Sequence, residues 1–138
     1  MGYTITAAVP LGFPEAVGRV RAALGEQGFG ILTEIDVRGT FEHKLGVDAA
    51  EAVGEYLILG ACNPSLAQRA IAAEPQIGAL LPCNVVIRND ETAGTSIVEA
   101  IDPQTMVQLS GSPTVQEVAD EASARLRAAL EAVQTEAE

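Results

Sequence analysis

The chain has 138 residues, enough to bury a core as one domain, and 48% of them are hydrophobic, which excludes intrinsic disorder. Its formal net charge is −11, from 19 acidic against 8 basic residues, and the basic residues are scattered along the chain. Because nucleic acids and anionic membrane surfaces are bound through clustered lysine and arginine, neither is expected as a partner.

The apolar pattern predicts a series of short elements in chain order. Aromatic residues make up only 4% of the chain, so the core is expected to be aliphatic. Alternating or continuous apolar runs predict strands over residues 3–9, 29–37, 56–60, 83–88 and 95–101. Helical spacing predicts the main helices over residues 13–28, 63–74 and 112–133.

The boundaries of several elements are marked by capping residues. Asn63 followed by Pro64 predicts the start of a helix, because asparagine caps the first free N–H groups and proline suits the first turn. Thr40 is expected to cap a single helical turn that Gly46 ends. Residues 48–54 are equally compatible with a loop and a helix.

The second predicted strand, residues 29–37, has a clear alternation. Ile31, Thr33 and Ile35 are expected on one face, and Glu34 and Asp36 on the other. Two carboxylates on one face can act in acid/base chemistry, but exposed strand faces often carry acidic residues.

The order β-α-β-β-α-β-β-α predicts a single α+β domain over residues 1–138, with a mainly antiparallel five-stranded sheet covered by helices. One sheet face needs cover and the other is expected to be partly open. Residues 134–138 are expected to be a frayed tail. No apolar run reaches the length of a membrane span, and the N-terminus lacks the features of a signal peptide, so the expected location is the cytoplasm.

Two cysteines are the most distinctive candidates for chemistry. Cys62 directly precedes the cap of a predicted helix, where free N–H groups and the helix dipole favour a thiolate. Cys83 opens the next predicted strand, so antiparallel pairing would bring both thiols to one pocket. The alternative is that they are buried packing residues, which fits the apolar surroundings of Cys83 best. No four-ligand set indicates a structural metal, His43 is the only histidine, and no cofactor is expected.

Around these cysteines the chain resembles the domain-of-unknown-function family numbered three hundred and two. The segments that carry the resemblance, in the same order as in that family, are Gly28–Val37, Ile58–Pro64, Glu74–Gly78, Leu80–Val86, and Ile101–Pro103 with Met106. The resemblance implies a compact α+β fold related in topology to the TATA-box-binding-protein-like group, and a homodimer. It implies no reaction. The family's characteristic residues fall on Glu34, Lys44, Cys62, Pro64, Glu74, Pro82 and Cys83. Ala49–Gly54 departs from the aromatic or basic stretch usual there, which alters an expected pocket wall.

The sequence leaves two functions open, and does not decide whether the protein is an enzyme. The first is a dimeric module that binds a small molecule or a partner near Cys62 and Cys83. The second is a thiol protein that handles a disulfide, a persulfide or a soft metal through the same cysteines. An acid/base enzyme rests on residue type alone. The candidate binding residues are Glu34, Lys44, Cys62, Asn63, Glu74 and Cys83.

Overall fold

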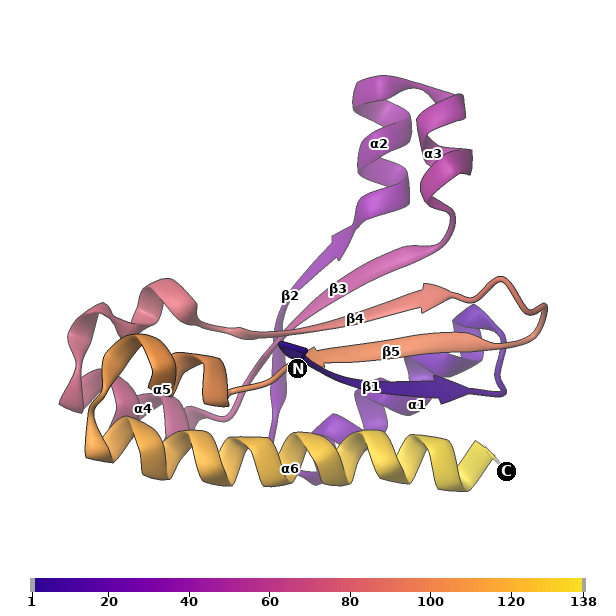
Figure 1. The fold of residues 1–138 in the computed structure, drawn as a ribbon. Helices are drawn as coiled ribbons and strands as arrows, with labels where there is room; N and C mark the ends of the chain where they lie inside the picture. Colours follow the sequence, from indigo (N-terminus) through magenta and orange to yellow (C-terminus); the bar gives the residue numbers. More distant parts are fainter. Residues whose placement is uncertain (1, 138) are drawn as a thin grey trace.

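The strands of the protein are β1 (Thr4–Val9), β2 (Gly30–Asp36), β3 (Tyr56–Cys62), β4 (Cys83–Asn89) and β5 (Ser96–Ile101). They form one five-stranded antiparallel sheet in the order β1-β5-β4-β3-β2 (Figure 1). The computed structural model describes residues 2–137, with side chains described up to residue 135. This sheet confirms the predicted α+β architecture, including the expected hairpin of β4 and β5.

Helices cover one face of the sheet and extend one end of it. They are α1 (Phe13–Glu26), α2 (Val37–Leu45), α3 (Val47–Val53), α4 (Pro64–Ala73), the 3-10 helix η1 (Pro75–Leu80), α5 (Gln104–Ser110) and α6 (Pro113–Ala137). α1 and α6 contact each other and lie beneath the sheet, while α4 and α5 pack against α6 (Figure 1). The opposite face of the sheet has no such cover among the described residues.

The main core lies between the sheet and the α1–α6 pair. Leu59, Val85 and Val98 project from the central strands, and Leu24 and Leu126 meet them from the two helices; all are fully buried. The core is therefore aliphatic, as the composition predicted. Burying a side chain of this size contributes about 1.5–3 kcal/mol, so this layer dominates the stability of the domain.

A second buried cluster lies where α4, η1 and α5 meet the first half of α6. Leu66, Ile77, Met106 and Val115 form its centre. This cluster holds the segment that connects η1 to β4 against the end of the sheet. It therefore fixes the wall of the candidate site described below.

Helices α2 and α4 begin at capping residues, whose side-chain oxygens accept hydrogen bonds from backbone N–H groups. Asn63 caps α4 as predicted, because its Oδ1 accepts the N–H of Leu66 at 3.2 Å. The predicted cap at Thr40 is wrong: α2 begins earlier, and Asp36 caps it by accepting the N–H of Gly39 at 2.9 Å. The Thr40 hydroxyl instead donates to the Asp36 carbonyl, one helical turn back.

A bulge in β2 changes which of its side chains share a face. Ile31 pairs with Ala61 on the core side, whereas Thr33 pairs with Gly60 on the open side, and the register shifts between them. The expectation that Ile31 and Thr33 share a face is therefore wrong. Because one extra residue reverses the alternation, Glu34 lies on the same side of the sheet as Ile31.

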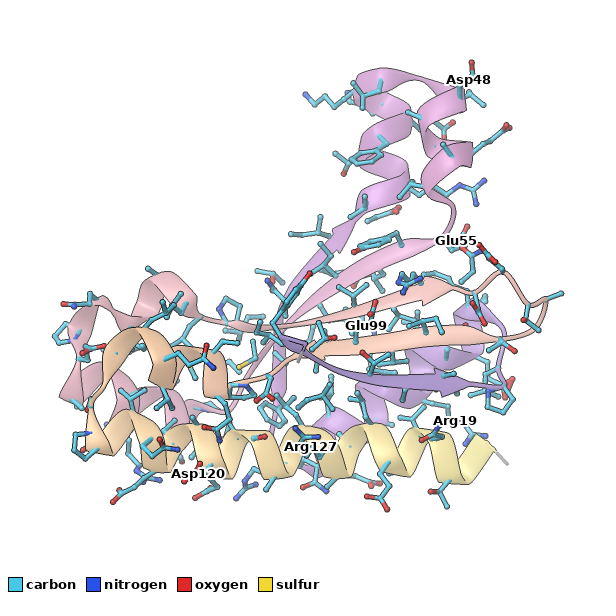
Figure 2. The ribbon with its side chains drawn as sticks, viewed as in Figure 1. Arg19, Asp48, Glu55, Glu99, Asp120 and Arg127 are labelled. Carbon is cyan, nitrogen blue, oxygen red and sulfur yellow. The ribbon has the colours of Figure 1, made fainter. Side chains whose placement is uncertain are left out.

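The α2–α3 hairpin projects from the ends of β2 and β3, away from the rest of the molecule, with Asp48 at its far end (Figures 1 and 2). The ambiguous segment 48–54 is thus helical over most of its length, and Gly46, at φ 101°, provides the turn between the two helices. Of their residues, all described by the structure, α2 buries none and α3 buries Ala50.

The long helix α6 continues to Ala137. Residues 134–137, expected as a frayed tail, are helical, and residue 138 lies outside the described residues. Within residues 2–137, no helix combines the length and apolar character needed to cross a bilayer.

Candidate functional site

A cleft of about 420 Å³ opens on the uncovered face of the sheet. Its floor is formed by β3, β4 and β5, and its wall by the segment from η1 to β4 together with α5. The lining residues are Tyr3, Thr4, Tyr56, Ala79, Leu80, Leu81, Pro82, Cys83, Asn84, Val86, Glu99, Ile101, Pro103, Thr105 and Met106. We call this set the cleft. Its volume lies within the range of ordinary small-molecule sites, roughly 300–1,000 Å³.

The register of the sheet brings polar groups together on an apolar floor. Asn84 pairs with Gly60, and Glu99 pairs with Val86, so both side chains project from the open face. Tyr56 projects from the same face of β3. Each comes from a different strand, and the apolar Val86 lies among them. The cleft thus combines a few convergent polar groups with apolar walls, as small-molecule sites do.

Glu99 is the charged residue of the cleft floor, and Arg88 holds it in place. The Arg88 Nε–H donates to Glu99 Oε1 at 2.8 Å, between diagonal neighbours on β4 and β5. This hydrogen bond is the main cause that raises the pKa of Arg88, with smaller contributions from the charges of Glu99, Tyr56 and Asp90. The Glu99 side chain is 23% exposed and projects over the sheet beside β4 (Figure 2).

A second, much smaller cavity of about 30 Å³ lies behind the wall of the cleft. Cys62, Asn63 and Cys83 line it together with apolar side chains such as Phe29 and Leu66. A space of this size holds water at most, because one water needs about 10–15 Å³ of such volume. The cavity is therefore not a ligand site by itself, but Cys83 contributes to both it and the cleft.

The two cysteines are neighbours on adjacent strands, and both are free thiols. Ala61 lies directly opposite Cys83, so strand geometry puts the Cα atoms of Cys62 and Cys83 roughly 6 Å apart. That separation is compatible with a disulfide, and both residues line the small cavity. Cys62 is half-buried, at the last position of β3, where the chain turns into α4.

Burial makes Cys83 a weak nucleophile. Its side chain is 7% exposed within the main core. Desolvation, followed by the nearby Cys62, raises the pKa of the Cys83 thiol from 9.0 to about 11, so it is protonated at neutral pH. A thiol that stays protonated neither attacks a disulfide readily nor binds a metal.

From the sequence, free backbone N–H groups at the N-terminus of α4 were expected beside Cys62. Most positions at this helix end offer no free N–H group. Pro64 has no N–H, the Leu66 N–H donates to Asn63 Oδ1, and the Ala67 N–H donates to the Asn63 carbonyl. Few backbone donors therefore remain to stabilise a thiolate at Cys62.

The order of the secondary-structure elements and the segments around Cys62 and Cys83 agree with those of a known protein family. A family model described as "Domain of unknown function DUF302" matches residues 5–133. The chain belongs to the DUF302 family. This confirms the resemblance drawn from the sequence. A search of the curated proteins gives no match.

A solved structure supports the same assignment. The crystal structure of an uncharacterized conserved protein DUF302 from Bacillus stearothermophilus is similar to this chain with a TM-score of 0.84 at 28% sequence identity. The similarity covers 95% of this chain and 98% of that one. The described fold is therefore shared by another DUF302 protein, and neither comparison assigns a reaction.

The residues that the sequence singled out do not form one site in this DUF302 domain. Glu34 and Lys44 line a shallow hollow beside α2, together with His43 and Asp36, and this hollow shares no lining residue with the cysteine cavity. Glu34 is also held in an ion pair with Arg21 of α1.

Glu74, the remaining candidate, caps the C-terminus of α4. Its carbonyl accepts the N–H of Ile77, which links α4 to η1, and it lines neither the cleft nor the cavity. Cys62, Asn63 and Cys83 are thus the candidates that the fold brings together. A binding role for any of the six stays a prediction.

Sequence reasoning missed Tyr56, Asn84 and Glu99, which contribute polar groups to the cleft floor. One signal could have found Glu99: it interrupts an apolar face of β5, between Ile97 and Ile101. A charged residue within an otherwise apolar strand face indicates either a partner or a ligand. Within the described residues, no group of three or more His, Cys, Asp or Glu side chains is placed to hold a metal ion.

Proposed function

We propose that this DUF302 domain binds a small organic molecule in the cleft on the open face of its sheet. The observation that carries the proposal is the convergence of Tyr56, Asn84 and Glu99 on an apolar hollow of about 420 Å³. Hydrophobic lining supplies contact area, and the few polar groups fix the orientation of the ligand. This site lies beside Cys83, which contributes to its wall, and uses the sheet rather than the thiols.

The thiol alternative has less support than the binding function. A redox or persulfide reaction requires a reactive thiolate and a second accessible thiol. Cys83 is buried and protonated, so it supplies neither a reactive thiolate nor an accessible second thiol. Its sulfur fits better the role of a small apolar side chain that separates the cleft from the core.

Ligand binding can be tested by screening small organic molecules with thermal unfolding, followed by amide chemical shifts. Val86→Phe places a ring on the cleft floor, whereas Ala8→Phe places one on the same sheet face at an exposed residue that pairs with Ile97, and neither Ala8 nor Ile97 lines the cleft. Molecules that bind the cleft should stabilise the wild type and Ala8→Phe, and lose this effect in Val86→Phe. Binders whose shifts map outside the cleft, with equal effects in all three proteins, would contradict the proposal.

A homodimer through the α2–α3 hairpin and the β2 edge forms the second part of the proposal. Leu45 and Val47 are 69% and 56% exposed on the hairpin, and Ile35 is 48% exposed at its base. Among the described residues β2 pairs only with β3, so its outer edge is open. A two-fold axis would pair two such edges antiparallel and cover the apolar side chains of both hairpins.

The mass of the protein in solution tests this assembly. Leu45→Glu places a charge in the proposed interface, and Leu109→Glu changes an equally exposed leucine on α5, at 73% exposure. Sedimentation should give a dimer for the wild type and Leu109→Glu, and a monomer for Leu45→Glu. A monomeric wild type at micromolar concentrations would refute the dimer and leave the ligand-binding proposal standing.

A further inference from the structure

The charge of the cleft points to the class of its ligand. Among its lining residues, all of them described, Glu99 is the one that carries a full charge at neutral pH. The lining contains no lysine, arginine or histidine, and the Cys83 thiol is protonated. An anionic ligand would therefore meet a carboxylate, and the cation beside it, Arg88, is already paired with Glu99.

The carboxylate of Glu99 keeps one oxygen for a ligand. Oε1 accepts the Arg88 Nε–H, whereas no hydrogen bond to Oε2 is found among the described residues. A carboxylate has about four acceptor positions, so Oε2 can accept N–H groups from an ammonium ion. Arg88 offsets part of the Glu99 charge, but it also holds the carboxylate in one orientation. Because the side chain is only 23% exposed, its interaction with a bound cation is screened less than on an open surface.

Aromatic rings contribute the second feature. The chain contains two tyrosines, and both Tyr3 and Tyr56 line the cleft. The face of an aromatic ring attracts a cation that lies within about 6 Å of its centre. Met106, Val86 and Ile101 add apolar surface for the body of the same molecule.

The net charge of the protein acts in the same direction. At −11 the whole chain attracts cations and repels anions, and this long-range field increases the rate at which cations reach a cleft. We infer that the cleft binds a small organic cation, an amine with an apolar body, whose ammonium group pairs with Glu99. This inference rests on the proposed ligand-binding function.

Three probes that share a phenylpropyl body test this inference: 3-phenylpropylammonium, 3-phenylpropan-1-ol and 3-phenylpropanoate. Their affinities can be measured by titration followed through amide chemical shifts of the cleft residues. The ammonium should bind at least about tenfold more tightly than the alcohol, which corresponds to about 1.4 kcal/mol. The carboxylate should bind most weakly.

Two variants assign the effect to Glu99. Glu99→Gln keeps the size of the side chain and removes its charge, and should weaken the ammonium about tenfold while changing the alcohol little. Glu117→Gln removes an acid of 70% exposure on α6 that does not line the cleft, and should change neither affinity. Tyr56→Leu should also weaken the ammonium, and Tyr56→Phe, which retains the ring, should restore most of the affinity.

The outcomes separate this inference from the proposed function. If the alcohol or the carboxylate shifts the cleft resonances as strongly as the ammonium does, the cleft binds small molecules and the cation inference is overturned. If Glu99→Gln weakens all three probes equally, the charge of Glu99 does not select the ligand, which overturns it as well. If none of the probes shifts a cleft resonance at millimolar concentration, both the inference and the proposed function are contradicted.

Discussion

Gly60 is the residue whose substitution tests the packing behind the cleft most directly. It lies in the central part of β3, on the open face, between Thr33 of β2 and Asn84 of β4. A Cβ atom added there would lie 2.1 Å from Thr33 Oγ1 and 2.8 Å from Pro82 Cγ. The threonine hydroxyl can rotate away, but the proline ring is rigid and also forms the cleft wall, so the chain must shift to accept Gly60→Ala.

The magnitude follows from two opposing effects. Replacing glycine by alanine restricts the unfolded chain and stabilises a protein by about 0.4–1 kcal/mol where the native backbone accepts it. Adding a methyl group to a packed position costs about 1–3 kcal/mol. We therefore expect Gly60→Ala to lower the free energy of unfolding by about 1–2 kcal/mol, measured by urea unfolding at fixed protein concentration.

A matched glycine provides the control. Gly18 lies within α1 with no atom within 4 Å of an added Cβ, so Gly18→Ala should raise the free energy of unfolding by about 0.5–1 kcal/mol. Adding Thr33→Ala to Gly60→Ala should recover part of the loss, because it removes the nearer contact and leaves Pro82. If Gly60→Ala stabilises the protein as Gly18→Ala does, the close packing of β3 against Pro82 is refuted.

Three further predictions concern the cysteines and the cap between them. Because burial raises the Cys83 pKa from 9.0 to about 11, the unfolded chain loses this proton at a lower pH than the folded protein does. The free energy of unfolding should therefore fall by about 2–3 kcal/mol as the pH rises from about 9 to 11. Below that window this thiol should make no contribution to the pH dependence. In Cys83→Ala this decline should disappear; an unchanged decline would contradict the burial argument. A thiol-specific reagent at neutral pH should modify Cys62 of the native protein faster than Cys83, because Cys62 is half-buried and Cys83 is buried. The Cys62→Ser variant should show no rapid reaction until the protein is denatured. Equal rates for the two thiols in the native protein would contradict this difference in exposure. Asn63→Ala removes the cap on Leu66 and should lower the free energy of unfolding by about 1 kcal/mol, whereas Asn63→Asp should retain most of it in the same urea experiment.

Much of the fold could be predicted because its signals are local. The Asn63-Pro64 pair begins a helix wherever it occurs, since the cap acts on N–H groups only a few residues away. The strands of the β4–β5 hairpin were visible in their own alternation. Local signals also misled where two of them competed: Asp36 and Thr40 both suit a cap, and the position of the β2 end decided for Asp36.

The sequence by itself determined an acidic, aliphatic α+β domain with its two cysteines at strand boundaries, because composition, alternation and capping depend on neighbours in the chain. The tertiary structure alone decided which side chains share a space. The β2 bulge turned Glu34 toward α1, and strand pairing brought Tyr56, Asn84 and Glu99 together from three strands. These arrangements depend on register between distant segments, and a shift of one residue would send each of those side chains to the other face of the sheet.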